Sequence, residues 1–395
     1  MSSQAALSLK IAESAPFFTK NLDLSITQKV GDKAHSLHYG VATQNRVDPD
    51  LVSYFINSYS QTGDLVLDPF AAKGEVALEA LLRGRRVFAS DQDKLGVLVT
   101  SAKMFPADIT EVTLALPMID LKRPVELGSY LQYFAPFYDV ATYRELVNLR
   151  KYLKEHTGSR VARFIEMIAL GLLHGQTAGF FSVYTSPVVS ISPKEQLALN
   201  AQRSQEPDYR AVIPRILRKA AMILRDGIPT CMMKASNESS VIISDTRYLV
   251  DLRANSVDLV VTTVPLPEQQ NNSQQLWLRS WFANIPAEGG IPYFSNCDTI
   301  NHWLDYMNEL LLELARVTKG GKRAVLNLNE VRYKNCPTSL DDLLIKMVTK
   351  QLNRYWEAEG IVNIKQLKPT LKNCLKPREN TKGDIANIAI VLRRR

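Results

Sequence analysis

One segment constrains the fold of this chain more than any other. Leu65-Val66-Leu67 is wholly apolar, a loop of small residues leads from it to Gly74, and apolar positions recur at helical spacing over 75–82. A second apolar run at 87–89 continues into Asp91. Wholly apolar runs of this length are typical of strands that are buried in a parallel sheet. The segment therefore predicts a strand–helix–strand unit, the building block of an α/β protein.

The rest of the chain predicts two α/β halves around a helical insert. Residues 131–240 are helical in pattern, and one of their helices is expected over 208–225 with a kink or restart at Pro214. We therefore divide the chain into residues 1–130, which hold an N-terminal motif and the first half of the α/β domain, the insert, and residues 241–395, which form the second half.

The second half continues the alternation of strands and helices. Its apolar runs and helical spacing predict strands over 241–243 and 257–261, a helix over 303–317, a strand over 324–328 and a late antiparallel strand over 388–392. Lys319-Gly320-Gly321-Lys322 is expected to close the helix before the next strand begins.

Composition excludes several classes of protein. The chain has 395 residues, 46% of them hydrophobic and 22% charged, which is ordinary for a globular protein and excludes wholesale disorder. No apolar run is long enough to span a membrane, and the N-terminus lacks the pattern of a signal peptide. The four cysteines stand far apart, so we expect neither a metal site nor a disulfide framework, and a cytoplasmic location. The net charge of +8 permits a polyanionic partner without requiring one.

The first loop has the features of a cofactor site. Ligands of open parallel sheets bind at the carboxyl ends of the strands, where this loop lies. Gly74 permits close approach of the backbone to a ligand, and the helix that begins at Glu75 directs its positive end to the same space. Asp91 ends the next strand and suits the two hydroxyls of a ribose. The spacing alone favours an adenosine-containing cofactor and an ordinary α/β loop about equally.

Several segments, taken in order, resemble a known family. They are HSLHY at 35–39, LVLDPFAAKG at 65–74, SDQD at 90–93, SDTR at 244–247, VDLVVTTVPLP at 257–267 and LARVTKGG at 314–321. Together they resemble the amino-directed DNA methyltransferases, which transfer a methyl group from S-adenosylmethionine to N4 of cytosine or N6 of adenine. The resemblance implies the α/β, seven-stranded, Rossmann-like sheet of S-adenosylmethionine-dependent methyltransferases, with the mainly helical insert as the candidate target-recognition region.

The resemblance also implies a set of cofactor-binding residues. The 68–74 loop would line the methionine end of S-adenosylmethionine, Asp91 would bind its ribose, and Asp245 would lie near its adenine. His38 and Tyr39 stand where the family's N-terminal motif approaches the methionine moiety. The full set is His38, Tyr39, Asp68, Pro69, Phe70, Ala71, Ala72, Gly74, Asp91 and Asp245.

The implied catalytic tetrad is Thr263, Val264, Pro265 and Leu266. In the family, a tetrad S/D/N-P-P-Y/F/W places a side-chain oxygen and a backbone carbonyl where they accept both hydrogens of the target amino group. Its aromatic residue stacks on the flipped base. Here Thr263 offers an oxygen and Val264 a carbonyl, whereas Leu266 offers no ring, and such stacking contributes about 1–3 kcal/mol per base.

The chain departs from the family at two further points. Ala72 stands at a glycine position of the cofactor loop, where its methyl group is tolerated if φ is negative, and Glu75 replaces a small hydroxyl residue. Trp277 and Trp281 lie downstream of the tetrad, where core packing is favoured over replacement of the missing ring.

The insert supplies the candidate DNA-binding residues. They are Arg203, Arg210, Arg215, Arg218 and Lys219. Three of these cations fall at helical spacing on one face and could neutralise phosphates, while the glutamines and Asn200 nearby could read base edges. A solvated helix face is an equally favoured interpretation.

We therefore expect a DNA methyltransferase with S-adenosylmethionine as its cofactor, which methylates N4 of cytosine or N6 of adenine, as in restriction-modification. Two alternatives stay open. The first is a catalytically impaired DNA-binding subunit that partners an active methyltransferase or a nuclease. The second is an RNA methyltransferase, for which no appended RNA-binding module is recognised. No membrane or metal is expected.

Overall fold

A single mixed sheet organises the molecule. The computed structural model describes residues 17–23, 34–42, 47–267, 276–286, 299–328, 340–365 and 386–395. In these ranges eight strands follow the order β1-β7-β8-β6-β5-β2-β3-β4. Neighbours pair in parallel except that β8 is antiparallel to β6 and β7. The strands are β1 Phe18–Asp23, β2 Leu65–Asp68, β3 Arg86–Asp91, β4 Ser240–Ile243, β5 Val257–Thr263, β6 Thr318–Leu328, β7 Trp356–Lys365 and β8 Ala386–Arg394.

The strand order identifies the fold. The seven strands β4-β3-β2-β5-β6-β8-β7, with β8 reversed, have the order of the S-adenosylmethionine-dependent methyltransferases, so the predicted fold class is confirmed. β1 is an eighth strand that the sequence analysis did not predict, and it pairs in parallel with β7 at the edge of the sheet.

Helices cover both faces of this sheet. α2 Pro49–Tyr59, α3 Glu75–Leu82 and α4 Lys94–Met104 share one apolar cluster with the sheet, and α12 Ile300–Val317 and α13 Leu340–Lys350 share a second. Successive residues of β2 divide between the clusters, Val66 facing the first and Leu67 the second. The wholly apolar character of this strand therefore follows from burial on both faces.

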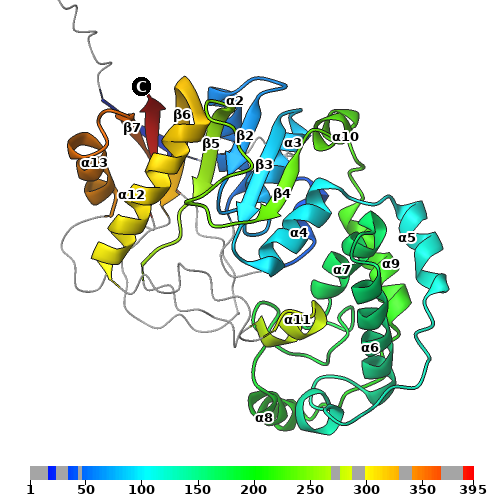
Figure 1. Cartoon of the computed structure of the whole chain (residues 1–395). Coiled ribbons are helices and arrows are strands. Elements are labelled where there is room, and N and C mark those ends of the chain that lie inside the picture. Colours follow the sequence, from blue (N-terminus) through cyan, green and yellow to red (C-terminus); the bar gives the residue numbers. More distant parts are fainter. Residues whose placement is uncertain are drawn as a thin grey trace, which may run out of the picture.

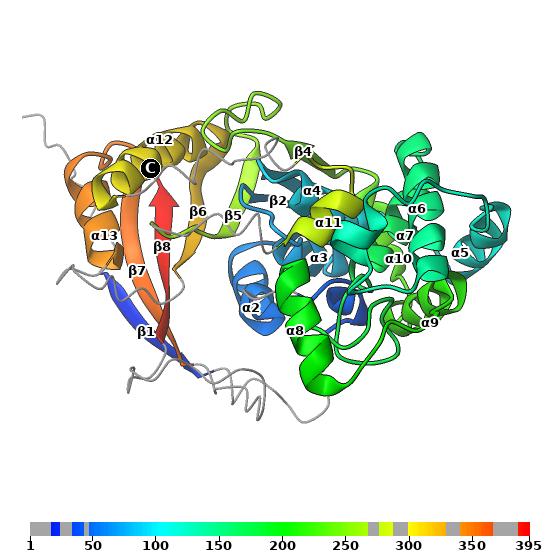
Figure 2. The same cartoon turned by 90° about the horizontal axis from the view of Figure 1, so that it is seen from below.

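The insert lies beyond the β4 edge of the sheet, and α12 and α13 lie toward the opposite edge (Figures 1 and 2). Its helices are η3 Tyr130–Phe134, α6 Val140–Glu155, α7 Arg160–Leu170, α8 Pro193–Arg203, α9 Val212–Ile223 and α10 Thr230–Ser236. Four helices from outside its sequence bounds belong to the same region of the molecule: η1 Ser36–Tyr39, α5 Ile109–Ala115, η2 Leu116–Met118 and α11 Trp277–Phe282. α11 follows β5 in the chain yet packs on the insert, since the Trp281 ring lies 4.5 Å from that of Phe134 and stacks at 6.0 Å on that of Tyr143. Trp277 joins the same cluster, which is the packing role expected for both tryptophans.

Two predicted elements begin elsewhere than expected. α9 starts at Val212, so Pro214 lies in its first turn, where backbone N–H groups have no partner within the helix and proline causes no kink. β6 starts at Thr318, directly after α12, and includes the glycine pair that was expected to form a loop. No helix in the described ranges is both long and apolar enough to cross a bilayer.

Candidate functional site

The fold brings the two principal motifs together at one edge of the sheet. β2 and β5 are parallel neighbours, with Val66 opposite Leu259. Their carboxyl ends therefore lie side by side, and they lead into the 68–74 loop and the 263–266 tetrad. A hydrogen bond of 2.7 Å from the Thr262 hydroxyl to Asp68 Oδ1 joins the two strand ends directly.

The 68–74 loop turns sharply through two left-handed residues. Gly74, the N-cap of α3, has φ 72° and is buried, and a Cβ there would lie 3.0 Å from Thr100 Cγ2 on α4. Ala72 has φ 45°, so the condition under which its methyl group is tolerated without strain, a negative φ, is not met. The Ala72 side chain is exposed, so its methyl group meets no steric obstacle. The unfavourable effect of alanine at this glycine position is therefore the strain of its left-handed backbone conformation.

Asp91 holds the turn from the end of β3. Its Oδ2 accepts a hydrogen bond of 2.8 Å from the Ala72 N–H, and its Oδ1 accepts one of 2.8 Å from the Asp93 N–H. Burial raises the pKa of Asp91 to about 6. Each carboxylate oxygen has further acceptor capacity, so Asp91 can support the loop and still accept a hydroxyl.

Asp68 is buried beneath the loop and faces Thr262. Burial raises its pKa to about 7, although the bonds from Thr262 and from the Phe70 N–H lower it. The negative charges of Asp91 and Glu75 raise the same pKa further. Two negative charges therefore act on the buried Asp68 carboxyl group, which is an environment that favours a bound cation.

The remaining residues of the 68–74 loop that were predicted to bind the cofactor, Pro69, Phe70 and Ala71, contact the neighbouring β3 and α12. Ala71 is buried, and its N–H donates to the Ser90 carbonyl at 2.9 Å. Pro69 is buried as well, with its carbonyl 3.5 Å from the Ser90 hydroxyl. The Phe70 ring packs on the other side, 6.2 Å from the ring of Tyr306 on α12.

Asp245 lies next to the end of β3, because the Ser244 N–H donates to the Asp91 carbonyl at 3.1 Å. The Asp245 carboxylate forms a bidentate pair with Arg247, with a shortest distance of 2.7 Å. Arg247 also pairs with Glu309 at 2.7 Å and lies 5.3 Å from the centre of the Tyr306 ring. An arginine thus connects this predicted adenine-side acid to α12.

His38 and Tyr39 occupy η1, between α3 and α9. His38 is buried, with Nε2 2.6 Å from Glu79 Oε1, one helical turn beyond Glu75. Burial lowers the pKa of His38, in spite of the opposing effect of Glu79. Tyr39 is 45% exposed and lines a groove against α9. His38 therefore contacts the helix that follows the cofactor loop, and Tyr39 faces the insert.

The tetrad continues β5 beside β6 and α12. The Thr263 hydroxyl accepts a hydrogen bond of 3.2 Å from Asn327 Nδ2, and the buried Val264 donates its N–H to the Asn327 carbonyl at 3.0 Å. The Pro265 carbonyl accepts from Trp303 Nε1 at 2.9 Å. Leu266 packs against the apolar cluster of α12. These contacts hold the tetrad against β6 and α12.

The five predicted DNA-binding cations are dispersed. Arg210 is buried, and its guanidinium donates to the carbonyls of Thr177, Phe180 and Ser182 and pairs with Asp208. Arg210 therefore supports the 177–182 loop from inside, and the prediction of a phosphate contact does not fit its burial.

The other four cations lie nearer the surface. Arg203 covers the Tyr184 ring at 3.7 Å, and Arg215 donates to the carbonyls of Ala178 and Ala211. Lys219 donates to the Tyr39 carbonyl at 2.7 Å. Arg218 is exposed in the groove that Tyr39 lines. The predicted amide readers Gln196 and Asn200 are buried and bonded to each other at 2.7 Å, so neither is placed to read bases.

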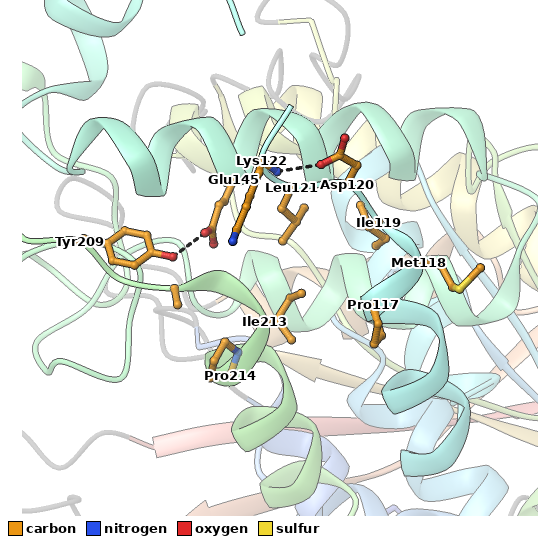
Figure 3. Close-up of a pocket in the computed structure, with 11 residues that line it drawn as sticks. Pro117, Met118, Ile119, Asp120, Leu121, Lys122, Glu145, Tyr209, Ile213 and Pro214 are labelled. Atoms are coloured by element: carbon orange, nitrogen blue, oxygen red, sulfur yellow. Dashed lines mark hydrogen bonds between the residues drawn. The ribbon is translucent and has the colours of Figure 1, made fainter. Parts of the chain in front are cut away.

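A separate cavity of about 500 Å³ lies between η2 and the start of α9 (Figure 3). Glu145 of α6 points into it and accepts a hydrogen bond of 2.6 Å from the Tyr209 hydroxyl and one of 2.8 Å from the Val212 N–H. The bond to Glu145 raises the pKa of Tyr209 to about 12. Glu145 therefore joins α6 to the first turn of α9.

Sequence reasoning missed several residues of the site. Asn327 and Thr262 lie near the carboxyl ends of strands, directly after apolar residues, where a polar residue gives no periodic signal. Glu79 could have been found, because it and Glu75 are the two acids of helix 75–82, whose other residues are apolar. Arg247 could have been found as well, since it follows Asp245 by two residues, the spacing of a local ion pair.

Comparisons with known proteins give structural neighbours only. No protein-family model and no curated protein matches the chain. Among solved structures, an rRNA methylase from Streptococcus thermophilus is 8% identical, with 89% of this chain and 99% of that chain covered and a TM-score of 0.33. The rRNA methyltransferase aviRa from Streptomyces viridochromogenes is 11% identical, with 91% of each chain covered and a TM-score of 0.32. A TehB-like SAM-dependent methyltransferase from Corynebacterium glutamicum is 10% identical, with 89% and 90% covered and a TM-score of 0.33. Because these TM-scores lie below 0.5, the strand order and its reversed strand, rather than the alignments, give this chain the fold of the S-adenosylmethionine-dependent methyltransferases.

Proposed function

We propose that this protein uses S-adenosylmethionine to methylate an exocyclic amino group of a nucleic-acid base, with DNA as the first candidate substrate. One observation carries the proposal. The 68–74 loop and the 263–266 tetrad meet at the carboxyl edge of adjacent strands, joined by the Thr262–Asp68 hydrogen bond. This is the edge at which open α/β sheets bind ligands.

The residues around the loop fit this cofactor. Gly74 carries no side chain at the N-terminus of α3, so a ligand can approach the backbone closely there. Asp91 keeps acceptor capacity for ribose hydroxyls. The negative charges of Asp91 and Glu75 raise the pKa of Asp68, so a sulfonium cation bound nearby would offset this repulsion and favour the carboxylate form of Asp68. The sulfonium carries the electrophilic methyl group, and the tetrad would orient the amino group that receives it.

A groove of about 430 Å³ between η1 and α9 supports a nucleic-acid substrate. Arg218 and the exposed Tyr39 and Met222 line it together with Lys219 and Arg225. A ring beside cations suits a stacked base and its phosphates. Arg225 is partly neutralised by Asp226 at 2.9 Å, which makes Arg218 the principal phosphate contact in this proposal.

A catalytically impaired nucleic-acid-binding subunit is the second candidate. Leu266 is packed against α12 and presents no ring to a target base, and Ala72 adopts a left-handed conformation that glycine would adopt without strain. In this reading the groove binds nucleic acid and an active methyltransferase supplies the chemistry.

Calorimetric titration and methyl transfer separate the two candidates. The wild-type chain should bind S-adenosylmethionine and transfer tritium from its methyl group to mixed plasmid DNA. Gly74→Val should weaken cofactor binding by at least tenfold, because a side chain at φ 72° is strained and meets Thr100. Gly128→Val is the matched control, since a Cβ there meets open space. Transfer to structured RNA alone would replace DNA by RNA, cofactor binding without any transfer would favour the impaired subunit, and no cofactor binding at millimolar concentration would refute the enzyme.

A further inference from the structure

Asn327 is the polar residue in the apolar carboxyl-terminal segment of β6, which reads AVLNL over 324–328. It lies opposite Thr263 in the register of β6 and β5, at the carboxyl edge of the sheet. Its side chain is 5% exposed and donates through Nδ2 to the Thr263 hydroxyl oxygen at 3.2 Å. The other end of the same amide, Oδ1, is buried and has no hydrogen-bond partner among the residues that the structure describes. A buried acceptor without a donor costs about 1–3 kcal/mol.

The orphan acceptor stands beside the tetrad oxygen. Transfer to an exocyclic amine needs two acceptors, one for each amino hydrogen, because the nitrogen lone pair must leave conjugation with the ring to attack. Thr263 Oγ1 keeps one acceptor site after its bond from Asn327, and Asn327 Oδ1 supplies another within the same residue pair. Both requirements are met by side chains of neighbouring strands.

We infer that Asn327 is a catalytic residue that accepts one hydrogen of the target amino group while Thr263 accepts the other. The inference rests on the proposed function and deepens it, because a pair of acceptors selects a primary amine over a hydroxyl or a carbon nucleophile. The Asn327 amide oxygen thereby takes the place of the backbone carbonyl that the tetrad supplies as its second acceptor, while Thr263 keeps the role of the first. The Nδ2 bond also keeps the Thr263 hydroxyl in one orientation.

The transfer balances without further groups. The amino nitrogen uses its electron pair to form the new N–C bond as the C–S bond of the sulfonium breaks, and that bonding pair remains on sulfur. One amino proton then passes to water, since neither a threonine hydroxyl nor a carboxamide is a base at neutral pH. Asn327 acts by holding the amine, not by removing its proton.

Asn327→Ala tests the inference in the full-length chain under single turnover, with cofactor and substrate saturating. Loss of one acceptor should lower the transfer rate about 10- to 100-fold. Cofactor affinity should stay within twofold of wild type. Asn327→Asp keeps an acceptor, so its rate should recover to within tenfold of wild type and should gain a pH dependence as the new carboxyl group ionises. Asn363→Ala is the matched control, because this asparagine lies on β7 and, in the described part of the chain, its side chain donates to Asn21 at 3.1 Å, away from the tetrad.

The outcomes separate the inference from the proposed function. A wild-type chain that transfers no methyl group to DNA or RNA refutes the proposed function, and the role of Asn327 falls with it. A wild-type chain that is active while Asn327→Ala keeps its rate within threefold refutes the inference alone. Loss of cofactor binding and rate together in both Asn327 variants, with a lower Tm, assigns the residue to the fold and also overturns the inference.

Discussion

The carboxyl edge of the sheet and the insert differ in how their polar side chains are brought together. At the edge, motif residues that lie nearly 200 positions apart in the sequence meet within one hydrogen bond, from Thr262 to Asp68. In the insert, five cations that are close in sequence are dispersed among ring faces, backbone carbonyls and solvent. Residues at strand ends are placed by the topology of the sheet, whereas a cation on a helix takes whichever acceptor folds against it.

Among these substitutions, Arg210→Ala in the insert should lower the stability of the protein the most. Removal of the buried guanidinium takes a donor from three carbonyls of the 177–182 loop, of which only that of Thr177 keeps another described donor, the Phe180 N–H, so the free energy of unfolding should fall by about 3 kcal/mol. Urea denaturation measures the loss. Nucleic-acid affinity should change little while the chain stays folded, and a variant of unchanged stability that no longer bound DNA would reverse this assignment.

Asp68→Asn should instead stabilise the sheet edge at alkaline pH. The pKa of this carboxyl group is about 7 in the fold and ordinary, near 4, in the unfolded chain. Between these values the unfolded state has lost its proton and the folded state keeps it, so wild-type stability falls as the pH rises from about 4 to 7. At pH 8 the variant should be more stable by about 2 kcal/mol, part of the gain being offset by the amide's own need for a partner.

Unfolding at pH 4 provides the internal control for this variant, because both forms are then neutral and should differ little. The same variant should bind S-adenosylmethionine more weakly if the carboxylate favours the sulfonium. Equal stability of the two proteins at pH 8 would show that Asp68 is not the destabilising charge.

Arg218→Ala should have the smallest effect on the fold and a selective effect on binding. The side chain is exposed, so the free energy of unfolding should stay within about 0.5 kcal/mol. DNA affinity should fall several-fold, and the slope of log K against log salt should decrease by about one. Fluorescence anisotropy over a salt series measures both, and an unchanged slope would remove Arg218 from the contact surface.

The α/β core was predictable from sequence because its strands are contiguous apolar runs. β2, α3 and β3 each occupy a few neighbouring residues, with Gly74 at the start of the helix and Asp91 at the end of the second strand. Both faces of their sheet are buried. The antiparallel β8 follows from the same signal at 388–392. Patterns of this kind need no knowledge of distant partners.

Other features depend on contacts that no local pattern contains. β1 reads FTKNLD, a largely polar segment, and becomes a strand only through β7. The three carbonyls that bind Arg210 come from a loop about 30 residues away. The Asn327 amide is oriented by its hydrogen bond to Thr263, which lies on another strand. Sequence reasoning could therefore locate the candidate site, but not which of its polar groups were already occupied.

The position of β1 has a consequence for how the protein is made. Phe18 lies where a side chain at Gly360 would be, within 2.5 Å of its ideal Cβ, so the first strand docks on a surface formed more than 330 residues later. At synthesis rates of about 5–20 residues per second, roughly 20–70 s separate the emergence of the two strands from the ribosome. The nascent N-terminal strand must therefore wait without its partner, and closure of this edge is among the last events of maturation.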